Sequence, residues 1–226
     1  MIRPVEKIDD LVPVKNVVIS VSDKKNLDIL INGLLKHCPG ANIYSTGGTY
    51  DVLRSIMTSQ EAEHLFEVSQ YTGQPETEGG LVKTLHHKLF LGYLTETYCE
   101  AHQQDLEREK AVPIDLAVIN LYRFQEVIAK PKTSFESARG NIDVGGPSAL
   151  RAVAKNFLRV MPCIDPGDYQ NLVEELALLQ GCTCIHSRFA AAGKVFRTLS
   201  NYDGTIAEYF ASADMEQVID NYQVFN

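Results

Sequence analysis

The chain has 226 residues, of which 45% are hydrophobic and 22% are charged, and its formal net charge is −8. This composition is typical of a globular domain with a sizeable core, and it excludes a disordered or repetitive chain. The acidic balance disfavours nucleic acid as a partner, because duplex binding needs a basic face. A few local donors still suffice to hold one small phosphate.

Strands and helices alternate from the start of the chain. Residues 16–21 form a β-branched run that predicts a buried parallel strand. Residues 26–36 carry leucines and an isoleucine at helical spacing, and a second short strand follows at 42–44. The turn at 45–49 then leads into a helix predicted at 50–57. This order is that of a βαβ unit.

The rest of the chain continues the alternation. The further predicted elements are a strand at 65–69, a loop at 70–80, a helix at 98–110, strands at 114–120 and 159–164, and helices at 124–129, 148–157, 168–180 and 187–213. We predict an α/β fold of three layers, with an open parallel sheet and C-terminal helices. Residues 1–13 are expected to form an N-terminal tail and residues 14–226 a single domain, with its helical part at about 166–213.

Cysteine usage and the absence of leader signals bear on the compartment. The five cysteines are odd in number and scattered, which predicts reduced thiols rather than disulfides. Cys182-x-Cys184 lies near His186, but two further ligands at suitable spacing are missing, so we predict no metal site. The N-terminal residues lack the apolar run of a signal peptide, and no segment is apolar enough to span a membrane. We therefore expect a cytoplasmic protein.

The strongest local motif is Ser45-Thr46-Gly47-Gly48-Thr49, between a strand and a helix. Two glycines let the backbone approach an anion, while hydroxyls and the first helical amides supply donors. Ser22 and Lys24 follow the first strand, and adjacent parallel strands bring such turns together. The motif is neither a P-loop nor a dinucleotide fingerprint. The residues alone leave open an ordinary βα turn and a simple helix cap.

Several titratable residues follow predicted strands or occupy glycine-rich loops. Lys83 lies beside a pair of histidines, Tyr122 follows a buried strand, and Asp143 precedes a helix that carries Arg151 and Lys155. A carboxylate, a phenol and lysines can perform acid–base chemistry and stabilise an oxyanion without a metal. Each of these residues taken singly is more often structural.

Taken together, these segments resemble the IMP cyclohydrolase domain of the bifunctional purine-biosynthesis enzyme, AICAR transformylase/IMP cyclohydrolase. The motifs occur in the family's order over roughly residues 14 to 213. They are Ser20-Val21-Ser22-Asp23-Lys24, Ser45-Thr46-Gly47-Gly48-Thr49, Tyr71-Thr72-Gly73-x-Pro75-Glu76, Gly80-x-Val82-Lys83-Thr84-Leu85-His86, Asn120-Leu121-Tyr122-x-Phe124, Asn141-Ile142-Asp143-Val144-Gly145-Gly146-Pro147 and Arg151-Ala152-x-Ala154-Lys155-Asn156.

The resemblance implies a methylglyoxal-synthase-like fold and closure of formyl-aminoimidazole-carboxamide ribotide to IMP and water, with no metal or organic cofactor. The implied catalytic residues are Lys83, Tyr122, Asp143 and Lys155. The implied substrate-binding residues are Ser22, Lys24, Ser45, Thr46, Gly47, Gly48, Thr49, Thr84, Asn120, Gly145 and Gly146. The implied partners are the ribotide and IMP, without nucleic acid or membrane, and the resemblance leaves open a homodimer and a separate formyltransferase.

Four positions depart from the family pattern. Leu81 stands where the family usually has Arg, and the other departures are His87, Arg123 and Gly140. A leucine cannot replace the charge and forked donors of an arginine. The alternative function is therefore a catalytically weakened purine-nucleotide-binding or sensor module of the same fold, and a methylglyoxal-synthase-type lyase ranks last. We expect no transformylase domain in this chain.

Overall fold

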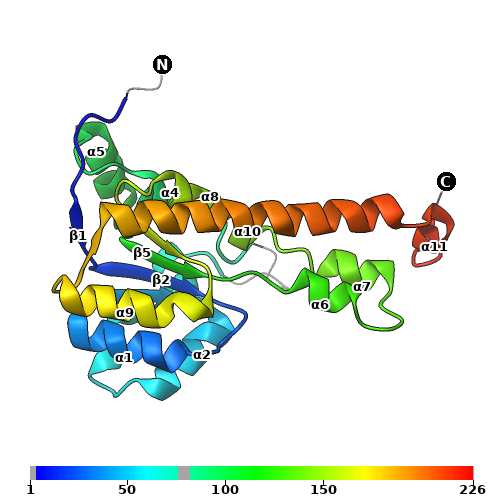
Figure 1. Ribbon diagram of the computed structural model, residues 1–226, viewed down its shortest axis with the longest axis horizontal. Helices are drawn as coiled ribbons and strands as arrows, with labels where there is room; N and C mark the ends of the chain where they lie inside the picture. Colours follow the sequence, from blue (N-terminus) through cyan, green and yellow to red (C-terminus); the bar gives the residue numbers. More distant parts are fainter. Residues whose placement is uncertain (1–3, 76–81, 226) are drawn as a thin grey trace.

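The computed structural model of the protein describes residues 4–75 and 82–225. Its centre is a parallel sheet in the order β4-β3-β2-β5-β6 (Figure 1). The strands are β2 (Asn16–Ser20), β3 (Asn42–Ser45), β4 (Leu65–Glu67), β5 (Leu116–Ile119) and β6 (Met161–Cys163). The predicted open parallel sheet is confirmed.

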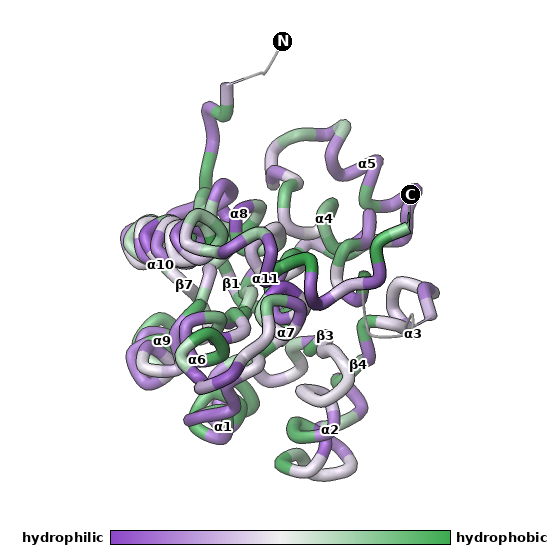
Figure 2. Tube along the Cα trace, turned by 90° about the vertical axis from the view of Figure 1, so that its right-hand side faces the viewer, coloured by the Kyte–Doolittle hydropathy of each residue, from purple (hydrophilic) through white to green (hydrophobic). Residues whose placement is uncertain are grey.

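Helices cover both faces of this sheet and complete the three predicted layers. Side chains of β2 alternate between the faces: Val17 and Ile19 enter one apolar cluster, and Val18 enters the other. Burying each such side chain contributes about 1.5–3 kcal/mol. One face packs against α1 (Leu27–His37), α2 (Gly47–Ile56) and α9 (Tyr169–Leu178), and the other against α4 (His87–Leu94), α8 (Gly145–Lys155) and the first half of α10 (Ile185–Ser212). Hydrophilic and hydrophobic residues alternate along α9 and α10 (Figure 2), as expected for helices that bury one side.

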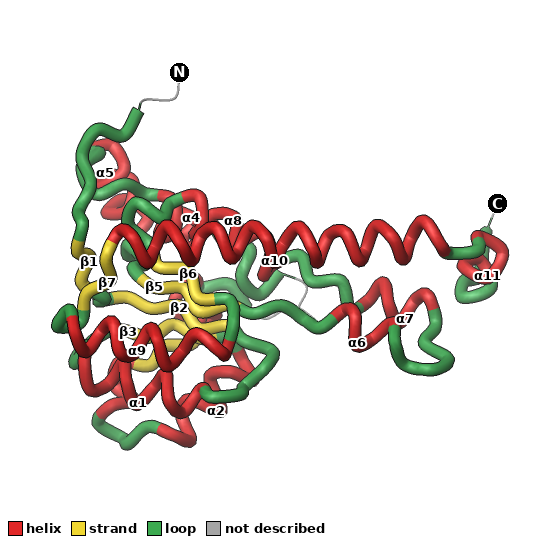
Figure 3. Tube along the Cα trace, viewed as in Figure 1, coloured by secondary structure: helices red, strands yellow, loops and turns green. Residues whose placement is uncertain are grey.

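A helical arm projects from the sheet domain (Figure 3). It consists of the distal half of α10 together with α6 (Phe124–Ile128), α7 (Phe135–Gly140) and α11 (Met215–Ile219). Aromatic rings hold the arm together, with centroids 5.6 Å apart for Phe124 and Tyr209 and 5.7 Å apart for Phe135 and Tyr209. None of the helices that the structure describes has the length and apolar character needed to cross a membrane.

Two short strands were not predicted. β1 (Leu11–Pro13) pairs antiparallel with β7 (Cys182–Cys184). The fully buried Arg188 of α10 donates to the carbonyl oxygens of Asp9 and Asp10, at 2.7 and 3.0 Å. The end of the segment assigned to an N-terminal tail is thus joined to the domain.

Two further α-helices of the described chain lie between β4 and β5. They are α3 (Val68–Thr72) and α5 (Glu100–Glu109). Two of the helices that border the parallel strands begin three residues earlier than predicted, α2 at Gly47 instead of 50 and α8 at Gly145 instead of 148. Glycine has a low helix propensity in a helix interior, which hid these first turns from the sequence pattern. Their early start places both helix N-termini beside the same group of strand ends.

Candidate functional site

A cleft of about 490 Å³ lies at the carboxyl ends of β2, β3 and β5. In open α/β sheets this edge is where ligands bind, and the volume is in the range of small-molecule sites. The cleft is lined by Ser20, Val21, Ser22, Lys24, Thr46, Gly47, Gly48, Thr49, Lys83, Thr84, Ile119, Asn120, Tyr122, Asp143, Gly145 and Gly146. The structure thus brings together most of the site residues predicted from widely separated motifs.

One end of the cleft is suited to an anion. The first amides of a helix have no intrahelical acceptor, and those of Gly47 and Gly48 in α2 border the cleft. A Cβ atom added at Gly48 would meet nothing within 4 Å, so the space beside it is open. The ammonium group of Lys24 donates to the Val21 carbonyl and, at 2.8 Å, to Thr49 Oγ1. An ammonium has three donors, so one remains for a ligand.

Burial lowers the pKa of Lys24. Its charge is therefore poorly solvated in the cleft, and a bound phosphate dianion would replace the lost water. The helix dipole of α2 acts in the same direction, because its positive end faces the cleft. These features fit the predicted phosphate position.

Three hydroxyl groups that were predicted to bind the phosphate donate their protons to backbone carbonyls of the protein instead. Ser45 is fully buried and donates to the Ile19 carbonyl at 2.8 Å. Thr49 donates to the Val21 carbonyl at 3.0 Å, and Ser22 donates to the Leu121 carbonyl at 2.8 Å. Their hydrogen bonds fix the loops around the cleft. Thr46 and Thr84 border the cleft as well, and Thr46 Oγ1 lies 3.1 Å from Ser20 Oγ.

Asn120 joins two strand ends instead of presenting its amide to the cleft. Its Oδ1 accepts from the backbone N–H of Ser22 at 2.7 Å, from Ser22 Oγ at 3.0 Å and from the Asp23 N–H at 3.0 Å. Its Nδ2 donates to the Asp23 carbonyl at 3.0 Å. Asn120 therefore positions the loop that carries Lys24, whereas the resemblance implies that it binds the substrate.

The other end of the cleft carries the groups suited to chemistry. Lys83, Tyr122 and Asp143 all border it, from three different segments. Asp143 Oδ1 accepts from the Gly146 N–H at 2.9 Å, and burial raises the pKa of the Asp143 carboxyl group. A carboxylate with a raised pKa is a better proton acceptor near neutral pH.

The two glycines at the start of α8 are needed for this packing. A Cβ atom at Gly145 would lie 2.8 Å from Thr84 Oγ1, and one at Gly146 would lie 2.6 Å from Asp143 Oδ2. Both distances are shorter than real Cβ contacts. The glycines therefore let Thr84 and Asp143 lie directly against the helix.

Lys155 is not among the described residues that line the cleft. It is the last residue of α8 and is exposed. Ten residues separate it from Gly145, which corresponds to roughly 15 Å along a helix with a rise of 1.5 Å per residue. The structure does not bring Lys155 to Asp143, and its catalytic role stays a prediction that this placement does not support.

Leu81, which stands where the family usually has an arginine, lies outside the described residues. Two other arginines, Arg123 and Arg139, are held in ion pairs with nearby carboxylates. Arg123 pairs with Asp23 and, at 2.6 Å, with Glu126. Arg139 pairs with Glu136 at 2.6 Å. In the described part of the cleft lining, the cationic side chains are Lys24 and Lys83.

Tyr202 contributes to the site and was not predicted to. It lies on α10, and its hydroxyl accepts the backbone N–H of Asp143 at 2.8 Å. The next residue, Asp203, pairs with Arg151 of α8 at 2.5 Å. The sequence places a tyrosine and an aspartate in this helix, but no local pattern shows which loop they contact.

Comparisons with known proteins agree with the fold. A family model described as "MGS-like domain" matches residues 32–148, and one described as "AICARFT/IMPCHase bienzyme" matches residues 153–225. "Bifunctional purine biosynthesis protein PurH" of Leptospira biflexa is 39% identical over 200 residues, which are 88% of this chain and 38% of that protein. The protein of the same name from Anoxybacillus flavithermus is 41% identical, over 88% of this chain and 37% of its own length.

A solved structure, "Crystal structure of ForH", superimposes with a TM-score of 0.73 at 33% sequence identity. The match covers 87% of this chain and 99% of that one. The chain spans less than two fifths of the two PurH relatives, 38% and 37% of their lengths.

Proposed function

This chain belongs to the MGS-like domain family, in the branch of the AICARFT/IMPCHase bienzyme, and on that premise we propose that it is an IMP cyclohydrolase. The proposed reaction closes the six-membered ring of formyl-aminoimidazole-carboxamide ribotide and releases water. The observation that carries the proposal is that the N-terminus of α2 borders the same cleft as Lys83, Tyr122 and Asp143.

The proposed binding mode assigns the ribotide phosphate to the amides of Gly47 and Gly48 and to the ammonium of Lys24. Phosphate binding at a helix N-terminus needs only these donors and the helix dipole. The base then extends toward Asp143. Binding at the phosphate helps to hold the formyl and carboxamide groups beside each other. Less conformational entropy is then lost when the two groups react.

The proposed chemistry follows from the groups at the base end. The carboxamide nitrogen attacks the formyl carbon, and Asp143 takes the proton that this nitrogen loses. Lys83 and Tyr122 donate to the formyl oxygen as its negative charge grows. The oxygen takes one proton from Lys83 to give a carbinolamine, and its hydroxyl then leaves as water with the proton held by Asp143. The former formylamino nitrogen passes its N–H proton to Lys83 as the C–N double bond forms, which restores both side chains. We leave Lys155 out of this scheme because of its placement.

Matched variants test the proposal. We expect Lys83→Ala and Asp143→Asn each to lower the rate of IMP formation by about 100-fold or more, as is usual for acid–base and oxyanion groups. Lys36→Ala is the control, because Lys36 is exposed in the last turn of α1. Near-normal cyclisation by both cleft variants would reject the assignment.

A second candidate function is a purine-nucleotide-binding module without efficient turnover. The observation that favours it is the loss of the family arginine at Leu81, together with the ion pairs that hold Arg123 and Arg139. Tight IMP binding without IMP formation would support it. Restored turnover in Leu81→Arg would then identify that position as the cause.

A further inference from the structure

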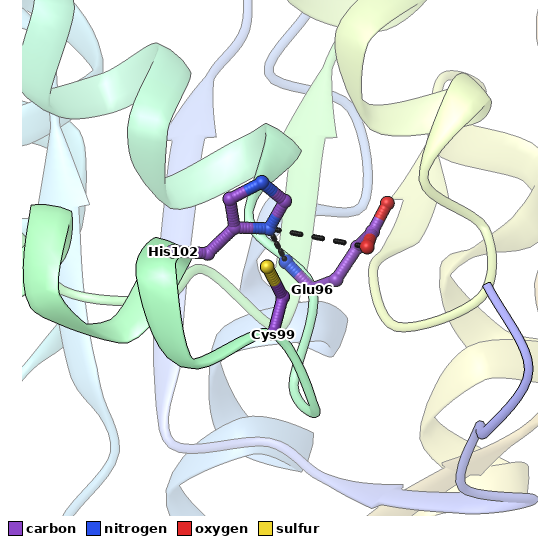
Figure 4. A group of neighbouring side chains, drawn as sticks. All are labelled: Glu96, Cys99 and His102. Atoms are coloured by element: carbon purple, nitrogen blue, oxygen red, sulfur yellow. Dashed lines mark hydrogen bonds and ion pairs between the residues drawn. The ribbon is translucent and has the colours of Figure 1, made fainter. Parts of the chain in front are cut away.

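Glu96, Cys99 and His102 converge at the start of α5 (Figure 4). Their ligand atoms lie within 4.8 Å of one another, and all three residues are half-buried. Cys99 is the N-cap residue of α5, and His102 lies three residues further on. Residues three apart at a helix start lie on the same side, and Glu96 approaches from the preceding turn. No other group of this kind occurs in the chain segments that the structure describes.

This cluster is remote from the proposed catalytic cleft. The nearby Thr95 carbonyl accepts hydrogen bonds from Asn156 and Arg159, at 3.0 and 3.2 Å, just before β6 begins. The cluster therefore lies at the amino ends of the strands, whereas the cleft lies at their carboxyl ends. Figure 1 shows α5 near the N-terminus of the chain, away from α2.

We propose that Glu96, Cys99 and His102 form a zinc-binding site. A thiolate and an imidazole are ligands that Zn²⁺ prefers, and a carboxylate is a common third ligand. One thiolate and one carboxylate neutralise the charge of the ion. Binding releases the Cys99 thiol proton to solvent and forms a zinc–sulfur bond.

The histidine already holds the tautomer that metal binding requires. Its Nδ1 accepts the backbone N–H of Glu96 at 3.1 Å and lies 3.9 Å from Glu96 Oε2. The Nδ1 lone pair is therefore unprotonated and directed at that backbone N–H, and Zn²⁺ displaces this hydrogen bond when it binds. In a tetrahedral zinc site the ligand atoms lie roughly 3.4–3.8 Å apart, given bonds of about 2.0–2.3 Å. Small side-chain rotations at Cys99 and Glu96 bring the three atoms to that spacing.

The cluster borders open space on the side of Glu96 and Cys99. A second cleft, of about 610 Å³, is lined by Glu96 and Cys99 on one side and by residues 4–7 on the other. Tyr98 donates to Asp9 at 2.6 Å and holds the N-terminal segment beside it. To the fourth coordination position we assign a water molecule, which exchanges with solvent through the cleft.

Cobalt substitution tests the site without reference to catalysis. The untagged full chain, freed of metal with a chelator, is titrated with Co²⁺ and then with Zn²⁺ against a chromophoric competitor. We expect one equivalent of Co²⁺ to produce a near-ultraviolet thiolate-to-cobalt band, which Zn²⁺ then abolishes. Cys99→Ser removes the band, and His102→Ala and Glu96→Gln weaken Zn²⁺ binding by about 100-fold.

Cys182→Ser and Cys184→Ser are the matched controls, because these half-buried thiols lie on β7 beside His186. We expect both to bind like the natural chain. No cobalt–thiolate band in the natural chain would overturn the proposal, and so would a band that survives in Cys99→Ser and disappears in either control. None of these readouts depends on cyclohydrolase activity.

Discussion

The hydrogen bonds of Asn120 give it a positioning role, whereas the family resemblance implies that it binds the substrate. The variant Asn120→Ala distinguishes the two roles. The substitution removes two hydrogen bonds that Oδ1 accepts from backbone amides, one that Nδ2 donates, and the share that Oδ1 has in the Ser22 hydroxyl proton, which also reaches the Leu121 carbonyl. Each such bond contributes about 0.5–1.5 kcal/mol net. Because Ser22 is exposed, water replaces part of the loss, and the low end applies. We expect the free energy of unfolding to fall by about 2 kcal/mol.

Denaturant unfolding measures this loss, and IMP binding measured by calorimetry shows its consequence. A loosened Ser22–Lys24 loop weakens IMP binding, since Lys24 is held on the same loop. Asn120→Asp is the companion variant, because a carboxylate still accepts from the two backbone amides. It should recover part of the lost stability. Unchanged stability in Asn120→Ala combined with lost IMP binding would refute the positioning role and support direct contact with the ligand.

Three further predictions concern Asp143 and its neighbours. Burial raises the pKa of the Asp143 carboxyl group, so its stabilising contribution is complete below about pH 4 and is lost as the pH rises through the raised pKa. At pH 7 the Asp143→Asn variant should therefore melt at a higher temperature than the natural chain, although it is less active. A difference in melting temperature between the two proteins that stays constant from pH 3.5 to 8 would contradict this. Gly146→Ala places a methyl group 2.6 Å from Asp143 Oδ2, so we expect the free energy of unfolding to fall by about 1–3 kcal/mol and kcat to be lower. Gly204→Ala is the control, because its methyl group meets nothing within 4 Å, and it should keep full activity. Tyr202→Phe removes the acceptor of the Asp143 N–H, so the free energy of unfolding should fall by about 1 kcal/mol and kcat should change more than KM. An unaltered kcat would show that Tyr202 does not contribute to the site.

The sequence alone predicts the sheet well because its strands are buried on both faces. Residues 16–21 and 114–120 are nearly continuous apolar runs, and β2 and β5 lie within them. The pairing of β1 with β7 could not be predicted in this way, because three-residue strands carry almost no periodic signal. That pairing depends on contacts between segments far apart in the chain, including those of Arg188 with the N-terminal segment.

The candidate site was predicted as a set of residues more accurately than as a set of roles. Motifs at the ends of parallel strands must meet at one edge, so Lys24 was expected beside the turn at 45–49. Lys83 and Asp143 were placed in the same site by the family resemblance. Which hydroxyl or amide remains available for a ligand depends on partners distant in the chain, as at Ser45 and Asn120. The position of Lys155 at the far end of α8 follows from helix rise and the early start of that helix at Gly145.

The most direct measurement of the proposed function follows IMP formation by ultraviolet absorbance when the natural chain is incubated with formyl-aminoimidazole-carboxamide ribotide. We predict sustained turnover that depends on Asp143 and Lys83. Tight binding of IMP with no IMP formed from the ribotide would contradict the account and would leave a nucleotide-binding module of the same fold.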